Sequence, residues 1–205
     1  MIRTNAILLL GPTGSGKTPL GEMLQARGLR GRRCAHFDFG DSLRRAVAAA
    51  SPPDGLTEED VAFLRRVLET GALLEDEHFP IARRILEGFI AARRIGPDDR
   101  IVLNGLPRHA GQARGVAGIV AVVAVIELRC TADVVSQRIR TDAGGDRSGR
   151  IDDDPAAVAT KLDIYTARIA PLVDHYRAAG ATIHIVDVHA DTTAEQVWNL
   201  LNDSV

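Results

Sequence analysis

The sequence predicts an α/β fold with a five-stranded parallel sheet and helices on both faces. Two observations indicate this fold: short apolar segments alternate with helical patterns along the chain, and the first apolar segment runs directly into a glycine-rich loop. Parallel strands are buried on both faces, so they are expected to be continuous apolar runs. Strands that alternate with helices in this way favour a parallel sheet covered by helices.

Five segments have the composition of buried strands. They are residues 6–10, 33–39, 100–104, 119–128 and 182–186. The first is fully apolar and ends at Gly11, as expected for a buried parallel strand.

Helical patterns occupy most of the chain between and after these strands. They cover residues 17–25, 42–50, 57–69, 76–94, 131–140, a long segment from 155 to at least 176, and 194–201. Thr57, with Asp60 three residues later, predicts an N-terminal cap for the third helix. Asp154 followed by Pro155 predicts the start of the long helix.

Composition limits the possible classes of function. The 205 residues suit one core with small inserts. A net charge of −2 provides no general positive field for nucleic acid or membrane, and an aromatic content of 4% argues against base-stacking platforms. No stretch approaches the roughly 20 apolar residues of a membrane span. Because heptads and large apolar stripes are also missing, we expect a cytoplasmic monomer.

The two cysteines lie far apart in the sequence and lack partners at metal-binding spacing. Cys34 and Cys130 both lie in or beside strand-like segments. We therefore expect small buried hydrophobic residues in a reduced compartment. The histidines show no metal-binding spacing either.

The loop after the first strand matches a phosphate-binding pattern. Residues 11–18 read GPTGSGKT and satisfy G-x-x-x-x-G-K-[ST] in full. The glycines allow backbone N–H groups to converge on phosphate oxygens, and the following helix N-terminus adds a favourable dipole. Lys17 is expected to contact the β and γ phosphates, and Thr18 to reach Mg²⁺. The predicted ATP-binding residues of this loop are Gly11, Thr13, Gly14, Ser15, Gly16, Lys17 and Thr18.

Further motifs follow this loop in a fixed order. They are FDFGDSLR at 37–44, ETGALL at 69–74, NGLPRHAGQA at 104–113, Arg138, SGRIDD at 148–153, Tyr165 and PLVDHY at 171–176. In this order and spacing the chain resembles the adenylate kinase family of nucleoside monophosphate kinases. The resemblance runs from the phosphate loop to about Val188, which is nearly the whole chain.

The resemblance implies a three-layer P-loop NTPase fold that forms a single kinase domain over residues 1–205. A core of residues 1–38, 80–140 and 154–205 would bind ATP. A small helical insert at 39–79 would cover the monophosphate, and a lid at 141–153 would close over both nucleotides. The lid is short and lacks cysteines, so it resembles the short, zinc-free type.

The resemblance also implies roles for individual side chains. Arg44 and Arg108 would hold the monophosphate, because arginine forks bind phosphate oxygens bidentately and stay charged. Gln112 would read the adenine edge with its amide. Arg138 would stack on the ATP base, and Arg150 of the lid would reach the transferred phosphoryl group.

The site predictions can be stated as two sets. The predicted catalytic residues are Lys17, Arg108, Arg138 and Arg150. The remaining residues expected at the monophosphate are Phe39, Arg44, Leu74, Gly105, Gln112 and Lys161, together with Arg108 and Arg150. Either Arg140 or Arg147 would supply a further lid arginine, and the spacing does not decide between them.

Four positions depart from the family pattern. Asn104 replaces an aspartate that helps to organise Mg²⁺ through water, and Lys161 replaces an arginine. Phe39 replaces a threonine that contacts the acceptor, and Leu106 replaces an aromatic residue. We predict that Thr18 and, through water, Asn104 contribute to the metal site. Asp38 replaces a family serine at the end of a neighbouring strand, and we hypothesise that it supplies the charge missing at Asn104.

These features predict an ATP-dependent nucleoside monophosphate kinase that transfers the γ-phosphoryl group of MgATP. Gln112 favours AMP as the acceptor. Two alternatives remain open. Phe39 and Asn104 are compatible with a P-loop kinase of another small acceptor. Asn104 and Lys161 are compatible with a nucleotide-binding regulatory protein that has little turnover.

Overall fold

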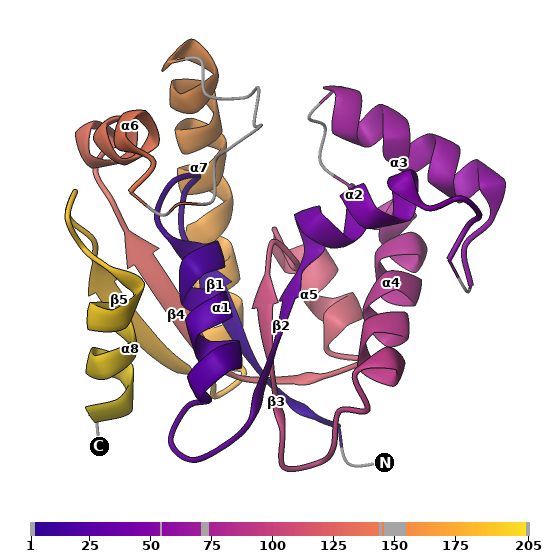
Figure 1. The fold of residues 1–205 in the computed structure, drawn as a ribbon, viewed down its shortest axis with the longest axis horizontal. Helices are drawn as coiled ribbons and strands as arrows, with labels where there is room; N and C mark the ends of the chain where they lie inside the picture. Colours follow the sequence, from indigo (N-terminus) through magenta and orange to yellow (C-terminus); the bar gives the residue numbers. More distant parts are fainter. Residues whose placement is uncertain (1–2, 54, 71–73, 144, 146–154, 204–205) are drawn as a thin grey trace.

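A computed structural model describes residues 3–53, 55–70, 74–143, 145 and 155–203, and it describes only the backbone of residues 155–164. Within these ranges the chain folds into alternating strands and helices (Figure 1). In order they are β1 (Asn5–Leu10), α1 (Lys17–Arg27), β2 (Cys34–Asp38), α2 (Phe39–Ala48), α3 (Glu58–Thr70), the 3₁₀ turn η1 (Asp76–His78), α4 (Phe79–Ala92), β3 (Arg100–Asn104), α5 (Ala110–Val116), β4 (Ala121–Arg129), α6 (Ala132–Thr141), α7 (Pro155–Ala178), β5 (Thr182–Asp187) and α8 (Ala194–Asp203).

The five strands form one parallel sheet in the order β2-β3-β1-β4-β5. This confirms the predicted sheet. The register pairs Leu9 of β1 with Asn104 of β3, and Asn104 in turn with Asp38 of β2. All strands run in the same direction, so their carboxyl ends, including the end of β1 that leads into the glycine loop, lie at one edge.

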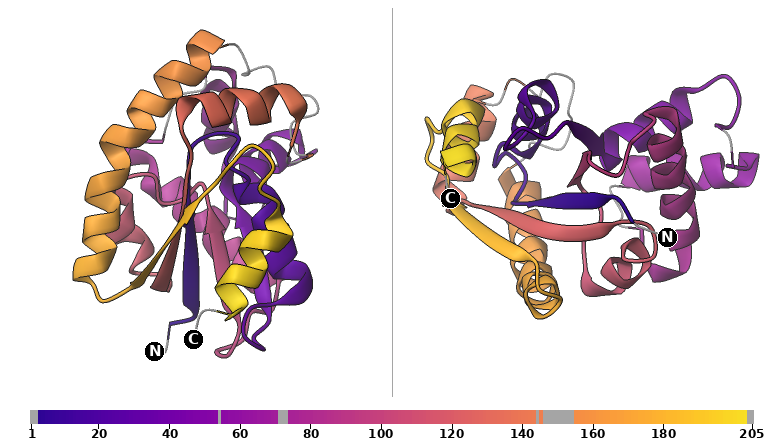
Figure 2. Two further views of the ribbon diagram at one scale, coloured as in Figure 1. Left: turned by 90° about the vertical axis from the view of Figure 1, so that its left-hand side faces the viewer. Right: turned by 90° about the horizontal axis from the view of Figure 1, so that it is seen from below.

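Helices cover both faces of the sheet, as predicted (Figure 2). Successive side chains of a strand point to opposite faces, and β1 shows this clearly. Leu8 belongs to a core cluster that includes Leu86 of α4 and Leu172 of α7. Its neighbours Ile7 and Leu9 belong to a second cluster, on the α1 and α8 side of the sheet. The sheet is therefore the middle of three layers.

Several predicted boundaries were wrong, and two of them have a clear local reason. The strand expected at 33–39 ends at Asp38, because the Asp38 side chain accepts a hydrogen bond from the Asp41 N–H at 2.9 Å and caps α2, which begins at Phe39. The helix expected from residue 76 begins as the turn η1 and becomes α-helical at Phe79, with Pro80 in its first turn. Helix α5 was not predicted.

The predicted cap at Thr57 is confirmed. Its hydroxyl accepts from the Asp60 N–H at 3.1 Å, and the Asp60 carboxylate accepts from the Thr57 N–H at 2.9 Å. Burial raises the pKa of Asp60, but hydrogen bonds from Thr57 and the charge of Arg84 outweigh it, so the pKa lies below its usual value. The cap predicted at Asp154 lies outside the described residues.

Both cysteines are free thiols in this structure. Cys34 is buried and Cys130 is half-buried. Burial raises the pKa of Cys34 to about 11, opposed by the nearby charge of Arg100. Both side chains therefore behave as small apolar residues, as expected.

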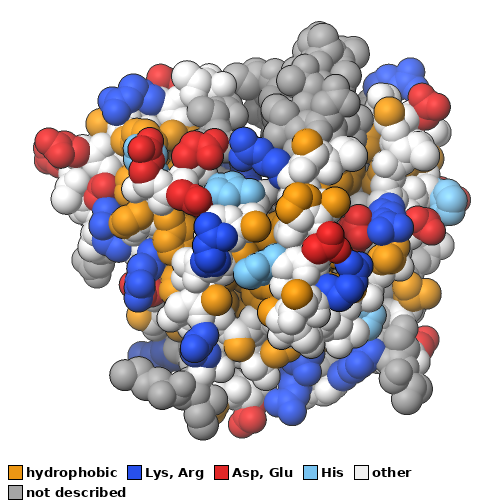
Figure 3. Space-filling model, turned by 180° about the vertical axis from the view of Figure 1, so that it is seen from behind, with side chains coloured by type: hydrophobic (Ala, Val, Ile, Leu, Met, Phe, Trp, Pro, Cys, Tyr) orange, Lys and Arg blue, Asp and Glu red, His pale blue; other side chains and the backbone are white. Residues whose placement is uncertain are grey.

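The surface gives little indication of a large charged or membrane-spanning feature. Basic and acidic side chains are interspersed on the face shown in Figure 3, in keeping with the small net charge of −2. None of the described helices combines the length and the apolarity that crossing a bilayer requires.

Two helical glycines test the packing of α4 against α5. A Cβ atom at Gly115 of α5 would lie 2.3 Å from Cε1 of Phe79, whereas one at Gly88 of α4 would meet nothing within 4 Å. We expect Gly115→Ala to lower the free energy of unfolding by about 1–3 kcal/mol through overpacking. Its matched control, Gly88→Ala, is expected to raise it by about 0.5–1 kcal/mol. Urea unfolding followed by circular dichroism measures both. Equal stability of the two variants would contradict this close packing.

Candidate functional site

The phosphate loop joins β1 to α1 at the carboxyl edge of the sheet. Gly14 and Gly16 have φ angles of 80° and 96°, which suit glycine. No side chain caps α1 at Gly16, and the N-terminus of a helix favours an anion through its dipole. The Ser15 hydroxyl is buried and lacks a hydrogen-bond partner among the described residues. These features fit a loop that receives phosphate oxygens.

Lys17 points back over the loop that precedes it. Its Nζ donates hydrogen bonds to the carbonyl oxygens of Gly11 at 2.7 Å and Pro12 at 2.8 Å. The ammonium group is thereby held at the mouth of the loop. A phosphate that enters the loop would offer stronger, charge-assisted hydrogen bonds to the same group.

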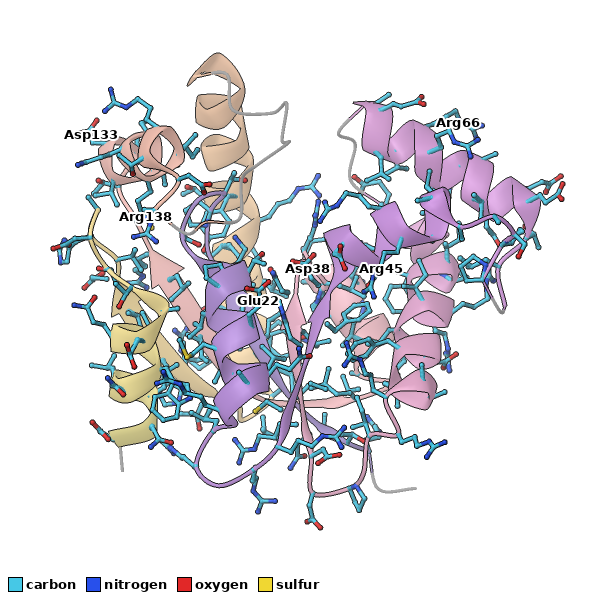
Figure 4. The ribbon with its side chains drawn as sticks, viewed as in Figure 1. Glu22, Asp38, Arg45, Arg66, Asp133 and Arg138 are labelled. Carbon is cyan, nitrogen blue, oxygen red and sulfur yellow. The ribbon has the colours of Figure 1, made fainter. Side chains whose placement is uncertain are left out.

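Three polar side chains from different elements meet beside the loop. The Thr18 hydroxyl donates to Oδ2 of Asp38 at 3.1 Å. Nδ2 of Asn104 donates to the same Asp38 oxygen at 2.9 Å and to Oγ1 of Thr18 at 3.2 Å. We call this group the Thr18–Asp38–Asn104 corner. Figure 4 shows Asp38 at the carboxyl end of β2, beside α2.

Arg108 lies on the turn that follows β3. Its Nε donates to the Gly105 carbonyl at 3.0 Å. Although Arg108 is exposed, the surrounding protein lowers its pKa by desolvation, Asp38 opposes this shift, and Arg168 adds to it. Arginine remains protonated under such shifts. The turn therefore presents a guanidinium close to the corner.

Arg44 lies in the second turn of α2, the helix that Asp38 caps. Its Nη2 lies 3.8 Å from Oδ1 of Asp41, and its side chain is 53% exposed. This ion pair is long and solvated, so it holds Arg44 weakly. Arg44 is thus available to an anion that approaches the start of α2.

Gln112 is buried, which the sequence did not indicate. It is 1% exposed, its Oε1 accepts from the Arg108 N–H at 2.8 Å, and its Nε2 donates to the Leu74 carbonyl at 2.7 Å. The amide therefore fastens the segment at Leu74 to the Arg108 turn. Leu74 itself is buried in the core.

Arg138 is also buried, with 4% exposure. Its Nε donates to the Gly14 carbonyl at 3.0 Å. Its Nη1 contacts three carbonyls of the loop after β5, those of His189, Ala190 and Thr192, at 2.8–3.2 Å. Figure 4 shows Arg138 below α6, on the side toward the phosphate loop. The side chain joins two loops at the carboxyl edge of the sheet.

A pocket of about 410 Å³ lies between the end of β4 and α7. Its lining includes Pro12, Tyr165 and Glu127, and Glu127 accepts from Arg129 at 3.1 Å. Burial raises the pKa of Tyr165, and its hydroxyl lacks a partner among the described residues. The pocket therefore adjoins the phosphate loop at Pro12 and carries a buried carboxylate paired with Arg129.

Curated proteins named adenylate kinase match this chain over most of its length, whereas no protein-family model matches it. The enzyme of Stenotrophomonas maltophilia strain K279a is 31% identical over 186 residues, 87% of this chain and 89% of the relative. That of Xanthomonas campestris pv. campestris strain 8004 is 31% identical over 205 residues, 95% and 98% of the two chains. The chain belongs to the adenylate kinase family. At the level of this family it is a phosphotransferase that acts on nucleoside monophosphates.

Within the adenylate kinase family this chain is divergent, and the structure accounts for one of its departures. Phe39 is 2% exposed and lies in the core cluster, 6.1 Å from the ring of Phe37. It follows the capping residue Asp38, so its side chain points into the core at the start of α2. This favours a space-filling role over direct contact with an acceptor. Gly105 lies next to it, because a Cβ there would be 3.6 Å from the Phe39 Cβ.

Some predicted residues lie outside the described part of the chain. They are Arg147, Arg150 and most of the expected lid at 141–153, as well as the side chain of Lys161. Arg140 is described and exposed at the end of α6. The roles of these residues stay predictions.

One basic residue near the site was not predicted from the sequence. Nη2 of Arg168, in α7, lies 3.6 Å from Oε1 of Glu75. The positive charge of Arg168 also contributes to the lowered pKa of Arg108. It is seven residues after Lys161, and this spacing places two residues on the same face of a helix. That spacing was the signal available in the sequence.

Proposed function

We propose that the protein transfers the γ-phosphoryl group of MgATP to AMP and so produces two molecules of ADP. One observation carries the proposal: the Thr18–Asp38–Asn104 corner connects the phosphate loop to the Arg108 turn. Thr18 of the loop donates to Asp38 at 3.1 Å, and Asp38 acts electrostatically on Arg108. A donor phosphate held by the loop and an acceptor phosphate held by Arg108 would therefore be neighbours.

On the donor side, the loop would bind the ATP phosphates. Backbone N–H groups around Gly14 and Gly16 would contact phosphate oxygens, and Lys17 would turn from the carbonyls of Gly11 and Pro12 to the β and γ phosphates. The buried Ser15 hydroxyl is a further donor. For Arg138 we propose stacking on the base, from a position fixed by its carbonyl contacts.

On the acceptor side, Arg44 and Arg108 would orient the monophosphate. Transfer of this kind depends on alignment and on neutralising charge more than on a strong base. We propose that the guanidinium groups aim an acceptor oxygen at the γ phosphorus. Arg168 is close enough to Arg108 to affect its pKa, so it adds positive charge on this side.

Magnesium, when bound, would neutralise the charge that develops on the phosphate groups. Hydroxyl, carboxylate and amide groups such as those of the corner fit this ion, which prefers oxygen ligands and is held partly by substrate phosphates. Among the described residues no group of three or more His, Cys, Asp or Glu side chains could hold a metal. We propose that the three side chains of the Thr18–Asp38–Asn104 corner hold the metal together with the nucleotide.

The domain organisation follows the same proposal. Residues 1–38, 80–140 and 154–205 form the ATP-binding core, residues 39–79 the acceptor insert, and residues 141–153 the lid. Closing of the lid would exclude water and bring Arg150 to the transferred group. The sequence prediction of a cytoplasmic monomer is part of this proposal.

The engaged amide of Gln112 favours a second candidate, a P-loop kinase with a different small acceptor. An amide has two donor and two acceptor sites, and Gln112 uses one of each on Leu74 and Arg108. Because Gln112 is only 1% exposed, its amide can contact an adenine edge only if the segment at Leu74 moves. If that movement does not occur, Gln112 is a structural residue and another group selects the acceptor.

A panel of acceptors separates these functions. The protein is incubated with MgATP and AMP, GMP, CMP, UMP or a deoxynucleoside monophosphate, and diphosphate formation is followed, with an acceptor-free reaction as the control for hydrolysis. We expect the highest kcat/KM with AMP. Turnover with another acceptor alone would support the second candidate. ATP binding without transfer to any acceptor would contradict both and support a regulatory protein.

A further inference from the structure

We propose that Asp38 is the carboxylate that positions the catalytic Mg²⁺, in place of the residue at 104. The charge expected at the end of β3 has moved to the end of the neighbouring strand β2. The inference rests on the proposed function, because it concerns the metal that accompanies ATP. It names a positioning residue that acts through Thr18 and bound water.

The sheet register brings the two positions together. Asp38 and Asn104 are paired residues at the carboxyl ends of the adjacent parallel strands β2 and β3. Their side chains are in direct contact, with Nδ2 of Asn104 donating to Oδ2 of Asp38 at 2.9 Å. A carboxylate at either position therefore reaches nearly the same point beside the loop.

The hydrogen bonds at this point determine which group offers charge to a cation. Thr18 donates its proton to Asp38 and accepts from Asn104, which leaves one lone pair of its oxygen for a metal. Asn104 acts as a donor to both partners. Of the described side chains hydrogen-bonded to Thr18, only Asp38 carries a negative charge. The amide orients the carboxylate, and the carboxylate supplies the attraction.

Asp38 also caps α2, and the two functions use different oxygens. Oδ1 accepts from the Asp41 N–H at 2.9 Å, while Oδ2 faces Thr18 at 3.1 Å. A cap needs only Oδ1, and serine or asparagine would serve equally well there. The contact of Oδ2 with the phosphate loop is therefore not explained by capping. Because α2 carries Arg44, one carboxylate connects the metal site to the acceptor insert.

Asp38→Asn separates the two functions. Asparagine keeps an oxygen for the cap and nearly the same volume, but it removes the charge. We expect the Mg²⁺-dependent part of ATP binding to weaken by about 10- to 100-fold, the usual effect of losing a residue that positions a metal. ATP binding without metal should not weaken, since a negative charge beside the phosphates is lost. Isothermal titration with ATP, with Mg²⁺ and with EDTA, measures both, and thermal unfolding checks that the cap remains.

Two further variants complete the test. Asp98→Asn removes a carboxylate from the exposed loop before β3, at the opposite edge of the sheet, and should leave both titrations unchanged. The exchange Asp38→Asn with Asn104→Asp returns the charge to β3 and should recover most of the Mg²⁺ dependence. Unchanged Mg²⁺ dependence in Asp38→Asn, or equal weakening with and without metal, would overturn the proposal. The exchanged variant would also overturn it by failing to recover Mg²⁺ binding while remaining folded.

The binding readout keeps this inference separate from the proposed function. If the wild-type protein transfers phosphoryl to no acceptor, but the Asp38→Asn variant loses Mg²⁺-dependent ATP binding, the kinase proposal is refuted and the metal site is supported. If the wild-type protein phosphorylates AMP, but the Asp38→Asn variant binds ATP with unchanged Mg²⁺ dependence, the kinase proposal is supported and the metal site is refuted.

Discussion

Replacing Arg108 by alanine is expected to lower kcat/KM for the monophosphate by about 10²- to 10³-fold, the effect of removing one preorganised charge donor from a transition state. The physical reason is the position of Arg108 on the Gly105 turn, where the protein already desolvates its guanidinium and Arg168 repels it. An acceptor phosphate would relieve both effects. ATP affinity should change little, because the phosphate loop is a separate element.

Steady-state kinetics with MgATP and AMP, together with titration of ATP, measure the two quantities. Arg114→Ala removes an exposed arginine from the next helix, α5, and is the matched control, expected to retain wild-type kinetics. Arg108→Lys should recover little activity, because lysine keeps the charge but loses the fork. An equal loss of ATP binding in Arg108→Ala would show that the acceptor site has been assigned to the wrong residue.

Most of the fold could be predicted because strands buried on both faces are continuous apolar runs, which can be recognised in the sequence. The strand at Arg100–Asn104 was predicted with its observed bounds, since it is a short apolar run between turns. Helix α5, with the sequence AGQARGV, was missed. Its two glycines weaken helix propensity, and seven residues give too little periodicity to recognise. Contact with α4, through Phe79 over Gly115, stabilises it instead.

The candidate site also has one part that could be predicted from the sequence and one part that could not. The residues of the phosphate loop follow from a local pattern, because their function depends on spacing within eight positions. The partners of Gln112 and Arg138 could not be predicted, since they are carbonyls distant in sequence. Gln112 binds Leu74, 38 residues away, and Arg138 binds Gly14, 124 residues away. A backbone carbonyl carries no sequence signal, so only the tertiary structure shows that these side chains are engaged.

Lys17→Met is expected to reduce phosphoryl transfer by about 10³-fold or more. Methionine has a similar length but no charge, and in the proposed function the ammonium group is the compact cation that would face the β and γ phosphates. MgATP binding should weaken less than transfer, because backbone N–H groups and the metal retain part of the contact. An equal loss in MgATP affinity and in kcat/KM, with kcat unchanged, would indicate that Lys17 acts only in binding.

The structural cost of this change must be measured separately. Lys17 donates to the carbonyls of Gly11 and Pro12, so the variant loses two hydrogen bonds within the loop, worth about 1–3 kcal/mol together. Urea unfolding of the ATP-free protein gives this value. Lys17→Arg is the second comparison, since it keeps the charge with a larger, planar head that fits the loop poorly. If Lys17→Met were destabilised but transferred phosphoryl at the wild-type rate, the lysine would only stabilise the loop. Another residue would then have to supply the cation that faces the γ phosphate. Loss of transfer in a variant that folds and still binds MgATP would assign that charge to Lys17.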